Sequence, residues 1–206
     1  MSTGLTYVVA LDLEFNQPSK KVIQIGAVMA DLANGSIDSG FSCFVNPNEP
    51  LDSGVAAMTG ISQDVLERAP TIEEAYTQMG DWLKPYELLR SLTPLVWGNG
   101  VTAVLCNAVG LKFSDEEWYF SAKPNNIKQF FALKSMHPMV YGFLARFGME
   151  TMLVGSLEAS VAKFGLAFEG QPNNPMYRAA NIFKLYRALI APPDEERIPD
   201  VSPPAL

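Results

Sequence analysis

The chain has 206 residues, 48% of them hydrophobic, which is enough to bury a full core, and we expect one domain. No apolar run approaches the roughly 20 residues of a membrane span, and the N-terminus lacks a basic-then-apolar signal, so we expect no membrane segment. The formal net charge of −7 argues against non-specific wrapping of nucleic acid, but not against a narrow groove for one strand end. Cys43 and Cys106 lack metal-type spacing, which is typical of reduced thiols in a cytoplasmic protein.

Three apolar segments near the N-terminus predict three consecutive strands, at residues 7–15, 22–29 and 40–45. The Asn34-Gly35 pair between the second and the third is a strong signal for a hairpin turn. Because hairpin turns join strands that run in opposite directions, we expect an antiparallel meander.

The first of these strands carries two acidic residues, Asp12 and Glu14. Side chains alternate along a strand, so both carboxylates are predicted on the same side. Two adjacent acids repel each other and resist burial, and a divalent metal such as Mg²⁺ is the usual compensation. The competing interpretation is an ordinary solvent-exposed face of the strand.

Helical spacing follows in the middle of the chain. Ser62 or Thr71 can cap a helix. The apolar positions of the predicted helix are Ala75, Met79, Trp82 and Leu83. Residues 95–97 predict a short buried strand, and residues 156–163 predict a further helix that ends near Gly165.

The clearest helix lies near the C-terminus, with Asn174 as the N-cap and Pro175 at the first helical position. Its predicted apolar face consists of Ala179, Ile182, Phe183, Tyr186, Leu189 and Ile190. Residues 192–206 are rich in proline and acidic residues, and we expect them to form an extended tail after a domain of residues 1–191. Strands first, then alternating helix and strand, indicate an α/β fold with a mixed sheet.

Several segments carry a family resemblance. Residues 11–14 and 22–28 are similar to the first motif of the DnaQ-like 3′–5′ exonucleases, the DEDDh enzymes. Residues 44–47, 58–61 and 153–189 resemble later parts of the same family, in the same order. The resemblance implies the ribonuclease H-like exonuclease fold, in which helices flank a central mixed five-stranded sheet that begins with an antiparallel meander.

The mechanism that the resemblance implies uses four acidic residues to hold two metal ions and a histidine as general base. Asp12 and Glu14 match the first acidic motif, as vestigial metal ligands. The second motif requires an aspartate after the strand at residues 95–97. Val101 or Val104 stands at that position, depending on the alignment.

The third motif departs from the family pattern at two positions. Asn173 replaces the histidine and Arg178 replaces the aspartate, and Asn126 also stands where similar proteins often carry an aspartate. An amide cannot act as a base near neutral pH, valine cannot bind a metal ion, and arginine repels cations. These replacements predict a catalytically inactive or severely impaired homologue.

We therefore interpret the chain as an exonuclease homologue that binds a single-stranded nucleic-acid end or a protein partner, as an inhibitor or adaptor without a cofactor. The candidate substrate groove consists of Phe15, Asn16, Met58 and Thr59. A purely structural subunit is another interpretation. Since many similar proteins form dimers, we also expect self-association.

The alternative is a divergent metal-dependent exonuclease with residual activity centred on Asp12 and Glu14. It would bind Mg²⁺ or Mn²⁺ weakly and would have to bring Asp115 or His137 to Asp12. His137 lies in a Met- and Phe-rich stretch, which is more typical of a core.

Arg178 leads to the most specific hypothesis. If the last helix keeps its place in the family fold, the guanidinium projects toward Asp12 and Glu14. A guanidinium is permanently charged and matches carboxylates geometrically. The hypothesis is that Arg178 replaces the metal ions as the positive charge that these acids need; the alternative is that it points into solvent.

The tail generates the first testable prediction. Its prolines preclude regular helix and it has few apolar anchors. Deleting residues 192–206 should leave the melting temperature nearly unchanged in a thermal unfolding experiment, and a large decrease would show that the tail packs on the core.

Overall fold

The computed structural model of the protein describes residues 7–86, 93–97, 131–132 and 156–190. Its strands are β1 (Tyr7–Phe15), β2 (Val22–Asp31), β3 (Ile37–Phe44), β4 (Thr93–Val96) and β5 (Phe131–Ala132). Its helices are α1 (Ser53–Thr59), α2 (Gln63–Glu67), α3 (Ile72–Leu83), the 3-10 turn η1 (Lys84–Tyr86), α6 (Leu157–Lys163) and α7 (Pro175–Ile190). The predicted tail at residues 192–206 lies outside the described residues.

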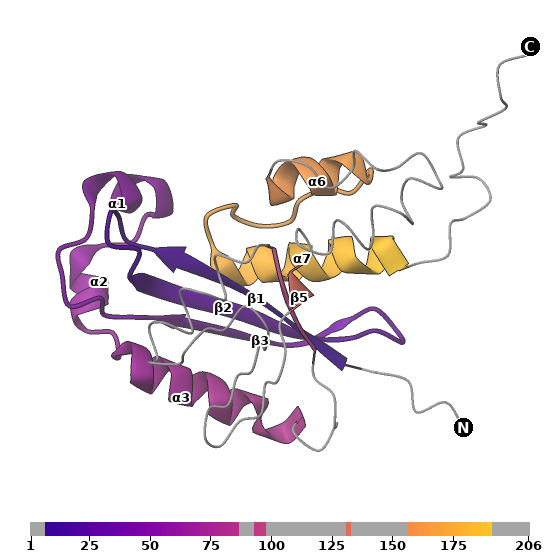
Figure 1. Ribbon diagram of the computed structural model, residues 1–206, viewed down its shortest axis with the longest axis horizontal. Coiled ribbons are helices and arrows are strands. Elements are labelled where there is room, and N and C mark those ends of the chain that lie inside the picture. Colours follow the sequence, from indigo (N-terminus) through magenta and orange to yellow (C-terminus); the bar gives the residue numbers. More distant parts are fainter. Residues whose placement is uncertain (1–6, 87–92, 98–130, 133–155, 191–206) are drawn as a thin grey trace, which may run out of the picture.

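The strands form one sheet in the order β3-β2-β1-β4-β5 (Figure 1). The pairs β1–β2 and β2–β3 are antiparallel, whereas β4 runs parallel to β1. The predicted mixed sheet, with an antiparallel meander at its start, is therefore confirmed. Beyond β4, the described residues contain only the two-residue segment β5, parallel to β4.

The hairpin between β2 and β3 is tighter than we predict from the sequence. Gly35 has a φ of 74°, and its N–H donates to the Asp31 carbonyl at 2.8 Å. The Asp31 N–H donates to the Ser36 carbonyl at 2.9 Å, so strand pairing continues up to the turn. For this reason β2 extends to Asp31 and β3 begins at Ile37, instead of ending at residue 29 and beginning at residue 40.

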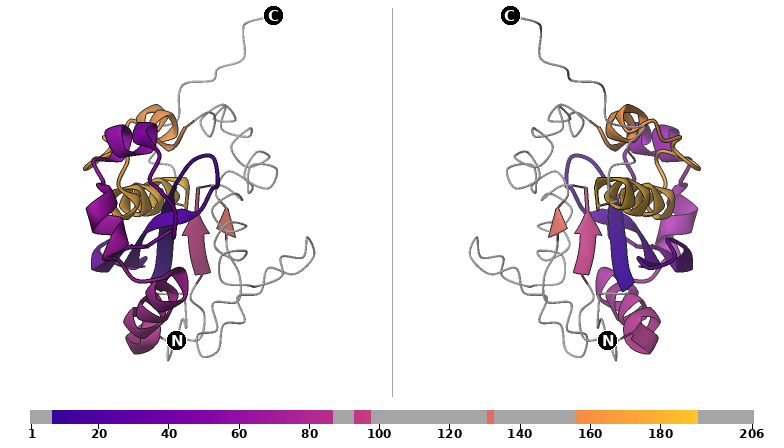
Figure 2. Two further views of the ribbon diagram at one scale, coloured as in Figure 1. Left: turned by 90° about the vertical axis from the view of Figure 1, so that its left-hand side faces the viewer. Right: turned by 90° about the vertical axis from the view of Figure 1, so that its right-hand side faces the viewer.

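Helices cover both faces of the sheet, with α3 on one side and α6 and α7 on the other (Figure 2). The alternation of β1 assigns its side chains to these two layers. Val9, Leu11 and Leu13 pack in the cluster that contains α3. Val8 and Ala10 pack with α6 and α7. The next residue on this second face is Asp12.

Local capping explains where α3 begins. The Thr71 hydroxyl accepts a hydrogen bond from the Glu74 N–H, and the Glu74 carboxylate accepts one from the Thr71 N–H, which together form a capping box. Ser62 precedes α2 without a side-chain capping bond. The predicted apolar positions Ala75, Met79 and Leu83 are buried, whereas Trp82 is half-buried and donates to the Ser39 hydroxyl at 3.1 Å.

The predicted start of α7 is confirmed. The Asn174 side-chain oxygen accepts hydrogen bonds from the N–H groups of Met176 and Tyr177, at 3.0 and 3.4 Å. Its most buried hydrophobic side chains are Ala179, Ile182, Phe183 and Leu185, and Tyr186 is half-buried. The predicted contributions of the Leu189 and Ile190 side chains lie outside the described residues.

The first turn of α7 approaches the sheet at Gly26, directly beside Asp12 in the β1–β2 register. A Cβ atom at Gly26 would lie 2.1 Å from the Met176 nitrogen and 2.3 Å from the Pro175 carbonyl carbon. These are backbone atoms and cannot move aside alone. The absence of a side chain at Gly26 therefore allows α7 to start where it does.

We expect Gly26→Ala to destabilise the fold by about 2–3 kcal/mol, because overpacking would displace the start of α7. Urea unfolding measures this change. Gly54→Ala is the matched control, since its Cβ would meet only a side-chain atom of Asp52, at 3.1 Å. Equal stability of the two variants would contradict the role of Gly26.

Candidate functional site

The candidate site lies at the end of β1, beneath the start of α7. Asp12 is 3% exposed and lies on the face that α7 covers. Glu14, two residues further, is half-buried and follows on the same face of the strand. The sheet thus brings both predicted acids to the position where the first turn of α7 passes over Gly26.

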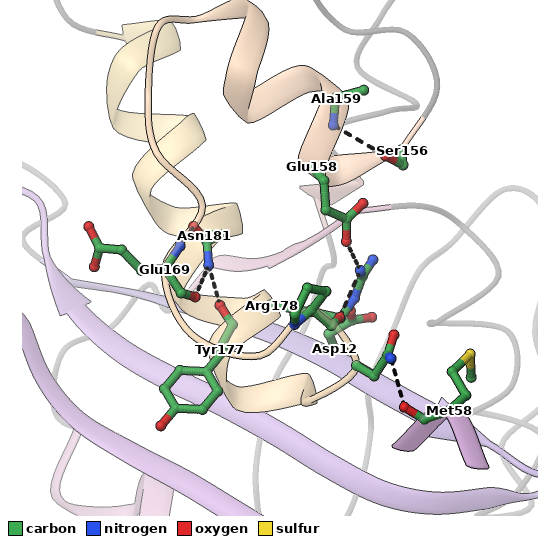
Figure 3. A network of polar contacts seen from close by, with 11 residues as sticks. Asp12, Met58, Ser156, Glu158, Ala159, Glu169, Tyr177, Arg178 and Asn181 are labelled. Atoms are coloured by element: carbon green, nitrogen blue, oxygen red, sulfur yellow. Dashed lines mark hydrogen bonds and ion pairs between the residues drawn. The ribbon is translucent and has the colours of Figure 1, made fainter. Parts of the chain in front are cut away.

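Arg178, one turn into α7, joins three parts of the chain (Figure 3). Its Nε donates to Asp12 Oδ2. Its Nη1 donates to Glu158 Oε1 at 2.5 Å and to the Pro172 carbonyl at 3.3 Å. The structure therefore places Arg178 against Asp12, whereas no ion pair among the described residues joins it to Glu14. Its second carboxylate partner is Glu158 on α6.

Polar contacts also fasten the connection between α6 and α7. The Asn181 side chain accepts from the Glu169 N–H at 3.1 Å and donates to the Glu169 carbonyl at 2.9 Å. Lys184 donates to the Ala167 carbonyl at 2.8 Å and forms an ion pair with Glu169 at 2.5 Å. These bonds hold the loop that supplies the Pro172 carbonyl to Arg178.

Burial and neighbouring charges both shift the pKa values of these groups. Burial raises the pKa of Asp12, and the Arg178 guanidinium opposes that rise. Burial also raises the pKa of Glu14, and the neighbouring Asp12 carboxylate adds to the increase. For Glu158, partial burial acts upward, but bonds from its own N–H and Ser156 and the charge of Arg178 hold its pKa below the usual value.

The four predicted groove residues occupy different environments. Asn16 is 1% exposed, and its amide bonds to the Glu49 carboxylate at 2.7 Å and to the Pro50 carbonyl at 2.9 Å. It also accepts from the Asp52 N–H at 2.8 Å, so its side chain is committed to holding the loop before α1.

The other three predicted groove residues are more accessible. Met58 is 52% exposed at the end of α1. The Thr59 hydroxyl donates to the Val55 carbonyl within the helix at 2.8 Å. Phe15 is half-buried and packs against the core on the α3 side.

Asn173 connects the two sides of the site. Its amide nitrogen donates to the Met58 carbonyl at 2.8 Å, and therefore links the loop before α7 to the end of α1. Asn173 itself is exposed. The amide thus makes a positional contact at the residue where the family resemblance predicts a histidine.

Comparisons with known proteins give the same assignment. Residues 9–105 match the RNase_T family model, described as exonuclease. A stretch of 68 residues is 33% identical to a PolC-type DNA polymerase III of Bacillus cereus, covering 33% of this chain and 5% of that polymerase. Over this N-terminal part the chain is similar to the DnaQ-like exonucleases. It spans only about 5% of the length of this relative.

Solved structures show the same fold. The nuclease domain of 3′hExo, a DEDDh family member bound to rAMP, superposes with a TM-score of 0.68 at 19% identity, over 89% of this chain and 90% of that domain. Cell-death related nuclease 4 gives a TM-score of 0.69 at 16% identity, over 90% of this chain and 64% of that one. The ribonuclease H-like exonuclease fold is therefore confirmed.

The two metal ions of DnaQ-like exonucleases do not fit the residues that the structure describes. Within that part of the chain, no group of three or more His, Cys, Asp or Glu side chains could hold a metal ion. One oxygen of Asp12 bonds to Arg178, and the guanidinium repels a second cation at short range. The site is arranged around an arginine.

Other predicted site positions lie outside the described residues. They are Val101, Val104, Asp115, Asn126 and His137. Of the helices that the structure does describe, none is long and apolar enough to span a membrane.

The sequence reasoning missed Glu158, although a weak signal existed. Glu158 lies in the first turn of α6, two residues after the capping Ser156, and acids are common there because the helix dipole favours them. The helix dipole alone accounts for an acid at this position, so the sequence gives no sign that Glu158 also pairs with Arg178. The contact depends on how α6 packs beside α7, which no local pattern encodes.

The half-buried Glu14 generates a prediction about pH. Because burial raises its pKa in the folded state, its contribution to stability is present below the unfolded pKa, about 4.3, and is lost as pH rises through the folded pKa. Glu14→Gln should therefore melt a few degrees above the wild type at neutral pH, with the difference closing on acidification.

Thermal unfolding between about pH 4 and pH 8 measures this effect. Glu73→Gln is the control, because Glu73 is an exposed acid in the first turn of α3 and the substitution removes the same charge. A Glu14→Gln variant that is less stable than the wild type at neutral pH would contradict the prediction.

Proposed function

We propose that this domain is a catalytically inactive member of the DnaQ-like exonuclease family, which acts by binding a nucleic-acid end or a protein partner. The observation that carries the proposal is the Arg178–Asp12 ion pair. It puts a permanent positive charge beside the carboxylate that the family resemblance predicts as a metal ligand.

The electrostatic argument has a definite size. A metal bound to Asp12 would lie within about 4 Å of the guanidinium, and a charge of +2 facing +1 at that separation is disfavoured by roughly 8 kcal/mol at an effective dielectric constant of 20. Coordination by one partly engaged carboxylate and Glu14 does not offset a penalty of this size. Metal-assisted hydrolysis would need Arg178 to leave the site.

The missing base supports the same proposal. An amide cannot take a proton from water near neutral pH, and the Asn173 amide donates to the Met58 carbonyl. Losses of groups that act together reduce catalysis by orders of magnitude. The domain keeps the sheet and the exposed end of α1, where Met58 is 52% exposed, and such a surface suits binding.

Support for a nucleic-acid end comes from the fold relative that is bound to rAMP. Support for a protein partner comes from the net charge of −7, which weakens association with polyanions. Binding of either kind would fit an inhibitor or adaptor.

Nuclease assays test the proposal. With labelled single-stranded RNA and DNA in Mg²⁺ or Mn²⁺, we expect no turnover above the protein-free blank, and no change in Asp12→Ala. Fluorescence anisotropy of the same oligonucleotides reports binding without cleavage. Asp64→Ala, an exposed acid on α2, is the matched control.

One result would contradict inactivity, and another would narrow the choice of ligand. Robust turnover that disappears in Asp12→Ala but persists in Asp64→Ala would establish a divergent metal-dependent exonuclease. Absence of both cleavage and anisotropy change would leave a protein partner as the proposed ligand.

A further inference from the structure

The disagreement between the family's metal ions and this chain's residues points to a specific replacement. We propose that Arg178 is a built-in cation that holds β1, α6 and the loop before α7 together, with Glu158 as its second carboxylate. It joins the chain segments as bound metal ions would, but it cannot catalyse hydrolysis as they do. This role rests on the proposed function only in one respect: Arg178 must stay in the site.

The contacts of Arg178 support a structural role. Its partners Asp12, Glu158 and Pro172 are separated from it by 166, 20 and 6 residues. One side chain therefore connects the central strand, the helix α6 and the intervening loop. A metal ion bound by acids from separate elements joins chain segments in the same way.

Burial separates this arrangement from an ordinary surface ion pair. The Arg178 side chain is 21% exposed and that of Asp12 only 5%. Surface pairs contribute little because water screens them. A desolvated carboxylate, in contrast, is strongly unfavourable once its partner is removed. Asp12 on the central strand thus depends on the guanidinium.

The shape of the guanidinium suits three acceptors at once. It is planar, carries five N–H donors, stays charged at all accessible pH values and is less strongly hydrated than an ammonium group. A lysine at residue 178 would provide the charge without the fork. The chemistry of the site therefore favours arginine.

Backbone contacts that do not involve the ion pairs also position the guanidinium. The absence of a side chain at Gly26 lets α7 start against β2, and the Asn174 cap fixes the first turn. Arg178 then lies one turn in, above Asp12, so that little freedom is lost when its bonds form.

Removing the arginine should allow a divalent cation to bind near Asp12. Asp12 and Glu158 would lose the guanidinium that now pairs with both of them, and Glu14 follows Asp12 on the same face of β1. Carboxylate oxygens are the preferred ligands of hard divalent ions. The wild type should thus be insensitive to divalent ions and the variant should become stabilised by them.

The experiment is thermal unfolding of the full chain and of Arg178→Ala, each with EDTA and with Mn²⁺. In EDTA we expect the variant to melt about 5–10 °C below the wild type. With Mn²⁺ at about ten times its dissociation constant, the variant should recover about 3–5 °C, and the wild type should not change.

Three further variants sharpen the result. Arg187→Ala removes an exposed arginine of the same helix, whose Nη1 bonds only to the Gly35 carbonyl among the contacts described, and should melt close to the wild type. Arg178→Lys should fall between the wild type and Arg178→Ala. Adding Asp12→Asn to Arg178→Ala should abolish the recovery in Mn²⁺.

Should Arg178→Ala fail to fold, Glu158→Gln provides the same test with one partner removed, and should melt about 2–5 °C below the wild type. Equal stability of Arg178→Ala and Arg187→Ala would overturn the proposal, as would equal stabilisation of the wild type by Mn²⁺. Nuclease turnover by the wild type would refute the proposed function while leaving these melting temperatures to decide the role of Arg178.

Discussion

The structure depends on one constraint: a carboxylate buried on the central strand needs a positive charge beside it. Asp12 is 3% exposed, and removing such a group from water is unfavourable unless it is paired and hydrogen-bonded. The charge comes from α7, which has to lie across the sheet at a defined height and rotation. The neighbouring Gly26 makes this placement possible, because it lets the helix backbone touch β2. Packing, helix position and electrostatics therefore all depend on the Asp12–Arg178 pair.

The same constraint extends outward from Asp12 in successive layers. Arg178 engages Glu158 and Pro172, and the loop carrying Pro172 is fastened by Asn181 and Lys184. On the other side of the site, Asn173 joins this loop to the end of α1. The contacts of Lys184 and Asn173 are exposed, and exposed contacts contribute modestly, whereas Asn181 is buried. Their combined effect is to fix the geometry around a single buried pair.

Much of this arrangement can be predicted from the sequence where the signals are local. The Asn34-Gly35 turn, the Thr71 and Asn174 caps and the alternation along β1 depend on neighbouring residues, and all appear in the structure. Contacts between distant segments could not be predicted, because no local pattern encodes them. Glu158 was missed because its partner lies 20 residues away. Asn16 was predicted to line a groove, yet its amide bonds to a loop 33 and 34 residues further on.

The three-point attachment of Arg178 also bears on how such a site changes over generations. A substitution of Arg178 by aspartate would break the bonds to β1, α6 and the loop in one step. It would also place a fourth carboxylate beside Asp12, Glu14 and Glu158, while Asn173 still could not serve as a base. Such a change would therefore lower stability in a single step. Under the proposed function, a metal site at this position would need several coordinated replacements.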